Sequence, residues 1–298
     1  MTLARANTAR ARRPVGAPRP AGARRPTGAR RPAELHSVFE RTLHEQRRAL
    51  AGWSAGLGTL AAVLLAFFPT LRGNASIAKL LEAYPKAFRE MFAIADFTTG
   101  PGYLRSEVFS LTGPLLVVIL AVLWGSDVVA GEEERGTVDV LLANPVSRRR
   151  VLVEKSAAVA TGVILVTGFF GVVLWLGGLL VGLDVGAEAL VAALISTALL
   201  ALVFSTLALL VAAGTGKRGL ARGVAAAVAV ASYLVSSLAS LVGWLRPVRP
   251  FSPWYHAIGV DPIGNGFEPW HLALLAGLAL ALVALAVAAY DRRDLGIS

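Results

Sequence analysis

The chain has 298 residues, of which 55% are hydrophobic and 16% are charged, and its mean hydropathy is +0.63. Soluble globular domains average about 25% charged residues, so this composition excludes a soluble domain and indicates an integral membrane protein. The net charge is +10 and no cysteine is present, which excludes disulfide bonds and thiolate metal sites.

Residues 1–33 repeat an Arg- and Pro-rich theme (ARRPVGA, ARRPTGA, ARRPA) without any aromatic residue. Such a segment buries too little apolar surface to offset its ordering entropy, so we predict a disordered cytosolic tail. Its arginines favour contact with anionic lipid headgroups, and the alternative is a solvated tail that only reinforces topology. We expect no nucleic-acid partner, because no aromatic side chains are interleaved for base stacking.

Residues 34–49 predict an amphipathic helix that lies in the membrane interface before the first span. Leu35, Phe39 and Leu43 fall on one face at helical spacing, and charged residues surround the rest. His36 and His44 flank Glu40 at intervals of four, which is a possible metal pattern. A solvated polar edge is the preferred reading, because the three residues have no further partner.

Six apolar runs are long enough to cross the hydrocarbon core, which takes about 17–25 helical residues. Their interiors carry no Lys, Arg or Glu, and Asp127 lies close to one end. We therefore predict an all-α membrane protein with a six-helix domain over residues 50–298. The predicted spans are Leu50–Phe68, Phe109–Ala130, Ala157–Val181, Leu190–Ala213, Val224–Val242 and Leu272–Tyr290.

The distribution of basic residues predicts the orientation of these spans. With a cytosolic N-terminus, the segments on the inside hold 22 of the 29 Lys and Arg residues, as the positive-inside rule requires. An even number of spans places both termini on one side. We expect a multi-pass protein of the plasma membrane with both termini in the cytosol.

Two long loops fall on the predicted outer side. The first, residues 71–108, contains apolar residues at helical spacing around Tyr84 and Met91, which predicts two short amphipathic helices. These helices are either an external gate or a simple packing layer on the span ends. The second loop, Gly243–Pro269, contains Trp244 and Trp254, which match an interfacial aromatic belt.

The fifth predicted span carries hydroxyl groups along one side, at Ser232, Tyr233, Ser236 and Ser240. Either a polar-lined substrate path or hydrogen bonding between helices explains this pattern. The substrate path is the weaker of the two readings.

The segment of residues 131–156, GEEERGTVDVLLANPVSRRRVLVEK up to Lys155, is the most informative on the predicted cytosolic side. An acidic turn precedes a short predicted helix, Thr137–Asn144, which ends at Pro145. A helix of this length is unstable alone in water, yet it exposes Val138, Leu141 and Leu142 on one face, so it needs a docking partner. The alternative is docking against the chain's own span ends or lipid headgroups.

The sequence lacks the motifs of an ATPase or a metalloenzyme. No GxxxxGK[ST] phosphate loop occurs, and the nearest pattern, at residues 214–218, lacks both the upstream Gly and the following Ser or Thr. The four histidines lie outside the predicted spans or at their outer surface. We therefore expect no catalytic residue, no metal and no cofactor on this chain.

The six spans, the long first outer loop and the run AGEEERGTVDVLLANPVSRRRVLVEK resemble the ABC type-2 permeases, which are membrane subunits of ATP-binding-cassette exporters. The resemblance covers about residues 35–298, and residues 131–148 are its most specific part. It implies a dimer of permeases, identical or paralogous, on separate ATPase subunits that bind ATP and Mg. It also implies export of a hydrophobic or amphipathic compound, such as a drug, an antibiotic or a lipid-like molecule.

In that family the first cytosolic loop is the coupling helix, which is seated in a groove of the ATPase. On this resemblance Val138, Leu141 and Leu142 form the buried contact, Glu133, Glu134 and Arg135 form polar links, and the arginines after Pro145 anchor the membrane edge. The implied coupling residues are Glu133, Glu134, Arg135, Gly136, Thr137, Val138, Leu141, Leu142, Pro145 and Arg148.

A second hypothesis uses the same topology without transport. The chain would then be a membrane scaffold or sensor that recruits a cytosolic partner through the basic tail of residues 1–33. Deletion of the tail discriminates the two, because transport survives the deletion and recruitment does not.

Overall fold

The structure is a computed structural model that describes residues 37–74, 76, 79, 83–85, 97–131, 134 and 147–293. These residues belong to one structural unit, residues 35–298, and the N-terminal tail lies outside them. The described residues form helices and connecting turns, without a strand.

Six stretches of helix are long and apolar enough to cross a membrane, which confirms the predicted all-α fold and its six spans. Helices suit this environment because the bilayer offers no water to backbone N–H and C=O groups. The spans are α1 (Val38–Leu71), the stretch Gly100–Gly131, α8 (Arg148–Val181), α9 (Ala187–Thr215), α10 (Arg218–Leu238) and α12 (Pro269–Arg292).

The second span is a composite of four consecutive pieces. It starts with α4 (Gly100–Tyr103) and a wide helical turn of the π type, η1 (Leu104–Phe109). It continues through α5 (Thr112–Ser126) into a second such wide turn, η2 (Asp127–Gly131). The span therefore begins nine residues before the predicted Phe109. The outer loop is correspondingly shorter than the predicted range of 71–108.

The first span also extends beyond its prediction. Residues 38–49, expected as a separate amphipathic helix, continue without a break into the apolar run, so that α1 is a single helix of 34 residues. An interfacial position for its first turns stays a prediction. The two short helices expected near Tyr84 and Met91 fall mostly outside the described residues.

Local chemistry explains where several helices begin and end. The Ser37 and Ser147 hydroxyls accept hydrogen bonds from the third backbone N–H of α1 and α8, as N-cap residues do. Gly182 ends α8 in the left-handed region at φ 67°, which costs glycine no side-chain clash. The chain then turns sharply into α9.

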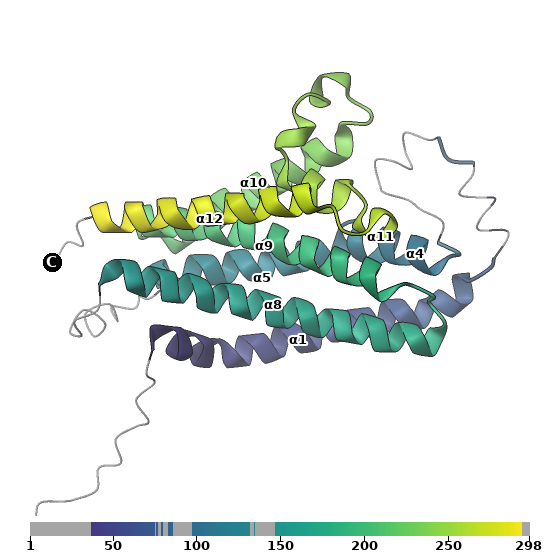
Figure 1. Cartoon of the computed structure of the whole chain (residues 1–298), viewed down its shortest axis with the longest axis horizontal. Helices are drawn as coiled ribbons and strands as arrows, with labels where there is room; N and C mark the ends of the chain where they lie inside the picture. Colours follow the sequence, from purple (N-terminus) through teal and green to yellow (C-terminus); the bar gives the residue numbers. More distant parts are fainter. Residues whose placement is uncertain are drawn as a thin grey trace, which may run out of the picture. The chain divides into compact units, whose positions relative to one another are not determined.

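Helix α9 is the centre of the bundle. It packs against α5, α8, α10 and α12, whereas α1 packs mainly against α8 at the periphery. In Figure 1 the starts of α1 and α8 and the end of α12 lie at one end of the bundle, and the α8–α9 turn lies at the other. We call these the basic end (residues 37–41, 126–131, 134, 147–155, 213–222 and 290–293) and the turn end (residues 72–74, 97–105, 181–187 and 243–269).

Short helical turns connect α10 to α12 at the turn end. They are η3 (Gly243–Leu245), η4 (Arg249–Phe251), η5 (Tyr255–Gly259) and α11 (Pro262–Asn265). His256 Nε2 is hydrogen-bonded to the Pro250 carbonyl oxygen, and His256 Nδ1 lies 2.6 Å from His271 Nδ1. Burial lowers the pKa of His256 and the Pro250 carbonyl opposes that shift, so the imidazole favours its neutral form.

Gly125 lets α5 and α9 approach until their backbones touch. A Cβ atom at this position would overlap the carbonyl oxygen of Ser205 on α9. Small residues allow such close approach between membrane helices. The position thus fixes the spacing of the two central helices.

We predict that Gly125→Ala lowers the free energy of unfolding by about 1–3 kcal/mol, the usual cost of overpacking a tight contact. The Ser205 carbonyl oxygen belongs to the backbone, so it cannot move aside by a side-chain rotation. Thermal unfolding of the purified protein in detergent micelles measures the effect. Gly277→Ala on α12 is the matched control, because a Cβ there meets open space; equal melting temperatures for the two variants would contradict the prediction.

Candidate functional site

The basic end holds a network of charged side chains centred on the start of α10. Arg218 and Arg222 are one helical turn apart and face the end of α5. Arg218 Nη1 lies 3.0 Å from Asp127 Oδ1, and Arg222 donates from Nε to Ser126 Oγ at 3.0 Å. Arg222 Nη2 is also 3.8 Å from Asp127 Oδ1. Two arginines of α10 therefore hold one carboxylate of the second span.

Glu134, three residues after the end of η2 and itself helical, joins this network. Its carboxylate lies 3.1 Å from Arg218 Nε and accepts a hydrogen bond from the Arg218 backbone N–H at 3.2 Å. Lys217 is the N-cap residue of α10, and its side chain forms no capping hydrogen bond. Glu134 thus supplies a negative charge and an acceptor at a helix start, where unpaired N–H groups and the helix dipole favour both.

Lys155 of α8 supports the wide turn η2. Its side chain is buried, and Nζ donates to the Val128 carbonyl at 2.9 Å. A wide turn shifts the backbone hydrogen-bond pattern, and such turns occur often at functional sites. A buried ammonium group bound to this carbonyl holds η2 in place beside Asp127.

The other side of the basic end ties α8 to the last span. Arg149 forms an ion pair with Asp291 of α12, and Arg148 Nη1 donates to the Arg293 carbonyl at 3.1 Å. Arg293 Nη1 donates in turn to the Ala213 carbonyl near the end of α9, at 3.3 Å. The start of α8 is therefore linked to the ends of α9 and α12.

The start of α1 is held by the same region of α8. Glu154 Oε2 accepts a hydrogen bond from the Phe39 backbone N–H at 3.3 Å, and Oε1 of the same carboxylate lies 2.7 Å from Arg150 Nε. The first three spans and α10 thus all have a charged or polar connection at this end.

A comparison with models of protein families identifies the family of the chain. The model of the ABC-2 family transporter protein matches residues 42–295. The chain belongs to the ABC-2 transporter family. No match is found among curated proteins.

Membership in the ABC-2 family makes the chain a multi-pass membrane component of a transporter, in a family whose membrane domains are not catalytic. The described residues contain no group of three or more His, Asp or Glu side chains arranged to hold a metal ion. The contacts of the described basic end are ion pairs and hydrogen bonds between helices.

Two of the predicted coupling residues are described, and both contact spans. Glu134 binds Arg218 of α10, and Arg148 binds the carbonyl of Arg293 at the end of α12. The others lie outside the described residues, and their roles stay predictions. They are Glu133, Arg135, Gly136, Thr137, Val138, Leu141, Leu142 and Pro145.

The predicted hydroxyl-lined path on α10 is engaged in local contacts. Ser232 Oγ is buried, 2.9 Å from Ser252 Oγ, and accepts from the Trp254 backbone N–H at 3.3 Å. Ser236 is buried, and Tyr233 packs edge-on against Trp254. Ser240 Oγ donates to the Ser237 carbonyl at 3.4 Å. These contacts favour the hydrogen-bonding alternative, and the path stays a prediction.

Sequence reasoning missed Arg218 as the partner of Glu134, and it missed the contacts of Arg222 and Lys155 beside it. The basic residues entered the sequence analysis only through the positive-inside count, and Asp127 only as a charge near a span end. The spacing of Arg218 and Arg222 at one helical turn is the signal that suggests a shared acidic partner.

We predict that Arg218→Gln lowers the melting temperature of the protein slightly. The variant loses two partly exposed ion pairs, whose attraction is weakened by solvent. Thermal unfolding in detergent micelles at low and high salt measures the loss, which shrinks as salt screens the wild-type pairs.

Arg292→Gln is the matched control for that variant. Arg292 is exposed at the same end and has no ion pair with any of the described residues. Equal melting temperatures for Arg218→Gln and Arg292→Gln would show that the network contributes no stability.

Proposed function

We propose that the chain is the permease subunit of an ABC exporter, powered by ATP hydrolysis on a separate ATPase subunit. ATP and Mg would bind to that partner and not to this chain. The permease would work in the plasma membrane as a dimer with a second copy or a paralogue. Both termini would lie in the cytosol, so that the basic end faces the ATPase.

We call residues 135–147, which include the predicted helix Thr137–Asn144, the coupling segment. The observation that carries the proposal is the anchoring of the two predicted coupling residues that flank it, Glu134 and Arg148. Glu134 precedes the segment and binds Arg218 of α10, which also binds Asp127 at the end of the second span. Arg148 follows the segment and binds the end of α12. A displacement of residues 135–147 would therefore act on different spans at its two ends.

This arrangement suggests how a partner's motion would reach the membrane. ATP-driven closure of two ATPase subunits would push on the segment, and rigid helices would carry that push into the bilayer. The spans would then exchange an inward-facing for an outward-facing path, provided that nucleotide binding favours one of these two states. The ion pairs are half-exposed and weak enough to rearrange in such a cycle.

The expected cargo is a hydrophobic or amphipathic compound such as a drug, an antibiotic or a lipid-like molecule. The spans offer apolar surface to the bilayer, and their described charged groups gather at the basic and turn ends. A compound that dissolves in the membrane can reach such a surface without crossing a polar barrier.

We predict that Leu141→Asp together with Leu142→Asp abolishes co-purification of the partner ATPase with the full-length chain. The substitution places two carboxylates on the apolar face that would be buried in the ATPase groove, and buried unpaired charges are strongly unfavourable. The ratio of ATPase to permease after affinity purification from detergent-solubilised membranes measures binding.

Val140→Asp is the matched control, because residue 140 falls on the opposite face of the predicted helix. We expect it to retain the ATPase at the wild-type ratio. Undiminished recovery with the double Leu variant would remove the docking claim, and equal loss with Val140→Asp would show that the face is not specific.

A further inference from the structure

Two imidazoles contact each other at the turn end. His256 belongs to η5, in the connection between α10 and α12, and His271 lies in the first turn of α12. Their Nδ1 atoms are 2.6 Å apart, and their ring centroids are 4.9 Å apart. We call these two residues the histidine pair.

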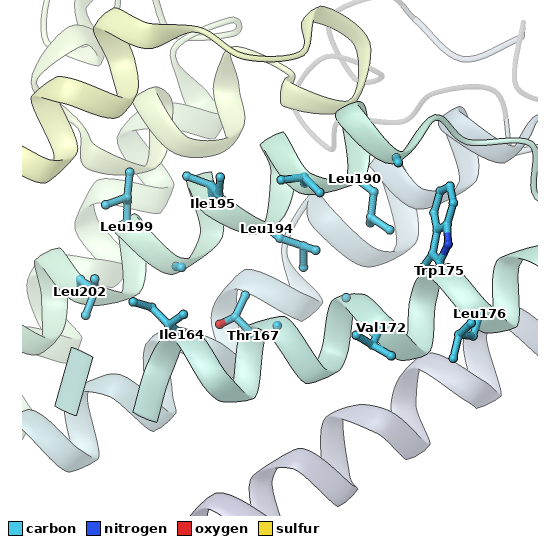
Figure 2. Close-up of a pocket in the computed structure, with 15 residues that line it drawn as sticks. Ile164, Thr167, Val172, Trp175, Leu176, Leu190, Leu194, Ile195, Leu199 and Leu202 are labelled. Carbon is cyan, nitrogen blue, oxygen red and sulfur yellow. The ribbon is translucent and has the colours of Figure 1, made fainter. Parts of the chain in front are cut away.

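The histidine pair is unlike the groove between α8 and α9. That groove is lined by apolar and small side chains and by Thr167, without a titratable group (Figure 2). His256 is nearly as inaccessible, at 5% exposure, yet an imidazole can change its charge within the physiological pH range. The contact between the two rings therefore depends on where their protons lie.

The hydrogen bonds of His256 determine the positions of these protons. The Pro250 carbonyl oxygen can only accept, so His256 Nε2, which is 2.6 Å away, carries a hydrogen and donates it. In a neutral imidazole the other ring nitrogen is then an acceptor. His256 Nδ1 thus accepts from Nδ1–H of His271, and the pair is hydrogen-bonded when both rings are neutral.

The pair can hold one additional proton but not two. If His256 is protonated, its Nδ1–H donates to Nδ1 of a neutral His271, and the contact is kept. If both rings are protonated, each Nδ1 carries a hydrogen and no acceptor is left between them. The two positive charges also repel each other at this short distance. Double protonation therefore breaks the contact.

A further positive charge lies beside the pair. The elements that pack against η5 are η4, α9, α10 and α12. On η4, the Arg249 guanidinium lies 4.6 Å from the centroid of the Tyr255 ring, and this ring is edge-on to both imidazoles. Arg249 thus adds to the repulsion that a second imidazolium would meet.

The acidic side chains on these elements do not offset that charge. Glu268 at the start of α12 and Glu188 in the first turn of α9 are exposed. The titratable group of α10 at this end is Tyr233, which packs against Trp254. Asp261, which follows η5, forms an ion pair with Arg105 at 2.8 Å. Neither imidazole has an ion pair with a carboxylate of the described residues.

The direction of the pH dependence follows from the surroundings of His256. Burial lowers the pKa of His256, the Pro250 carbonyl raises it, and the charge of a protonated His271 lowers it. The intact pair therefore binds protons more weakly than a solvated imidazole, whose pKa is about 6.5. By linkage, the contact is most stable above that pH and loses stability as the pH falls below it.

The histidine pair fastens the connection to α12, whereas hydroxyl groups fasten it to α10. Ser252 Oγ donates to the Ser232 carbonyl at 2.8 Å, and the Trp254 backbone N–H donates to Ser232 Oγ at 3.3 Å. Among the described residues, the histidine pair is the only side-chain hydrogen bond between residues 243–261 and α12. Hydroxyls do not titrate in this pH range, so acid releases the connection from α12 and not from α10.

We propose that the histidine pair is a pH-sensitive switch, which holds the connection on the first turn of α12 until both imidazoles are protonated and then releases it. Protonation of paired histidines is a known way to alter a contact in acid. On the orientation proposed above, the turn end lies outside the cell, so the switch responds to the external pH. The switch itself requires neither that orientation nor transport.

Hydrogen exchange of the full-length protein in phosphatidylcholine nanodiscs tests the switch. Exchange of the backbone amides of residues 252–261 is followed by mass spectrometry at two pH values, about one unit above and one unit below 6.5. Each rate is divided by the intrinsic rate at that pH, which gives the fraction of released molecules. We expect this fraction to rise about tenfold at the lower pH, the effect of one proton bound only after release.

Two substitutions of His271 separate the pH response from the contact. The amide of His271→Asn can donate to a neutral His256 or accept from a charged one, so we expect slow corrected exchange at both pH values. His271→Phe has no polar atom, and we expect fast corrected exchange at both. His44→Asn, at an exposed position of α1, is the matched control and keeps the wild-type response.

Three results would overturn the inference. The first is an equal released fraction at both pH values in the wild type. The second is a wild-type pH response in His271→Asn, because release would then need no second imidazole. The third is slow exchange in His271→Phe, because packing alone would then hold the connection. The measurement uses no ATPase, so loss of ATPase binding would overturn the proposed function alone.

Discussion

The bilayer supplies no water to ionised side chains or to backbone polar groups, and this constraint organises the whole molecule. It requires the backbone to be helical across the membrane, and the ion pairs among the described residues lie towards the two ends of the bundle. Arg72 with Asp184 and Arg105 with Asp261 lie at the turn end. The network of Asp127, Glu134 and Arg218 lies at the basic end.

The same constraint explains why the proposed functional parts differ so much in chemistry. At the basic end, partly exposed ion pairs connect α10 to Asp127 and Glu134. Glu134 immediately precedes the segment proposed to bind the ATPase. Within the spans, the buried side chains are mainly apolar, and the buried hydroxyls of Thr167 and Thr197 have no hydrogen-bond partner among the described residues. A polar atom is informative in such a place because it is expensive there.

The spans were predictable from sequence because run length and the absence of charge are local properties. Their ends were less so: α8 begins nine residues before the predicted Ala157, since a helix continues beyond the hydrocarbon core wherever its polar residues can be solvated or paired. Glu134 and Arg148 were predicted as site residues from their motif. The spacing of Arg218 and Arg222 suggests an acidic partner, but which carboxylate it is depends on how α5, α10 and α12 pack.

The most direct test of the account is the chemical accessibility of the coupling segment. The chain has no cysteine, so a single introduced thiol reports only its own surroundings. The rate of maleimide labelling of Leu142→Cys is measured in membranes with and without the ATPase, beside Val140→Cys. The account predicts that the ATPase slows labelling at residue 142 several-fold and leaves residue 140 unchanged. Equal rates at residue 142 with and without the ATPase would contradict it.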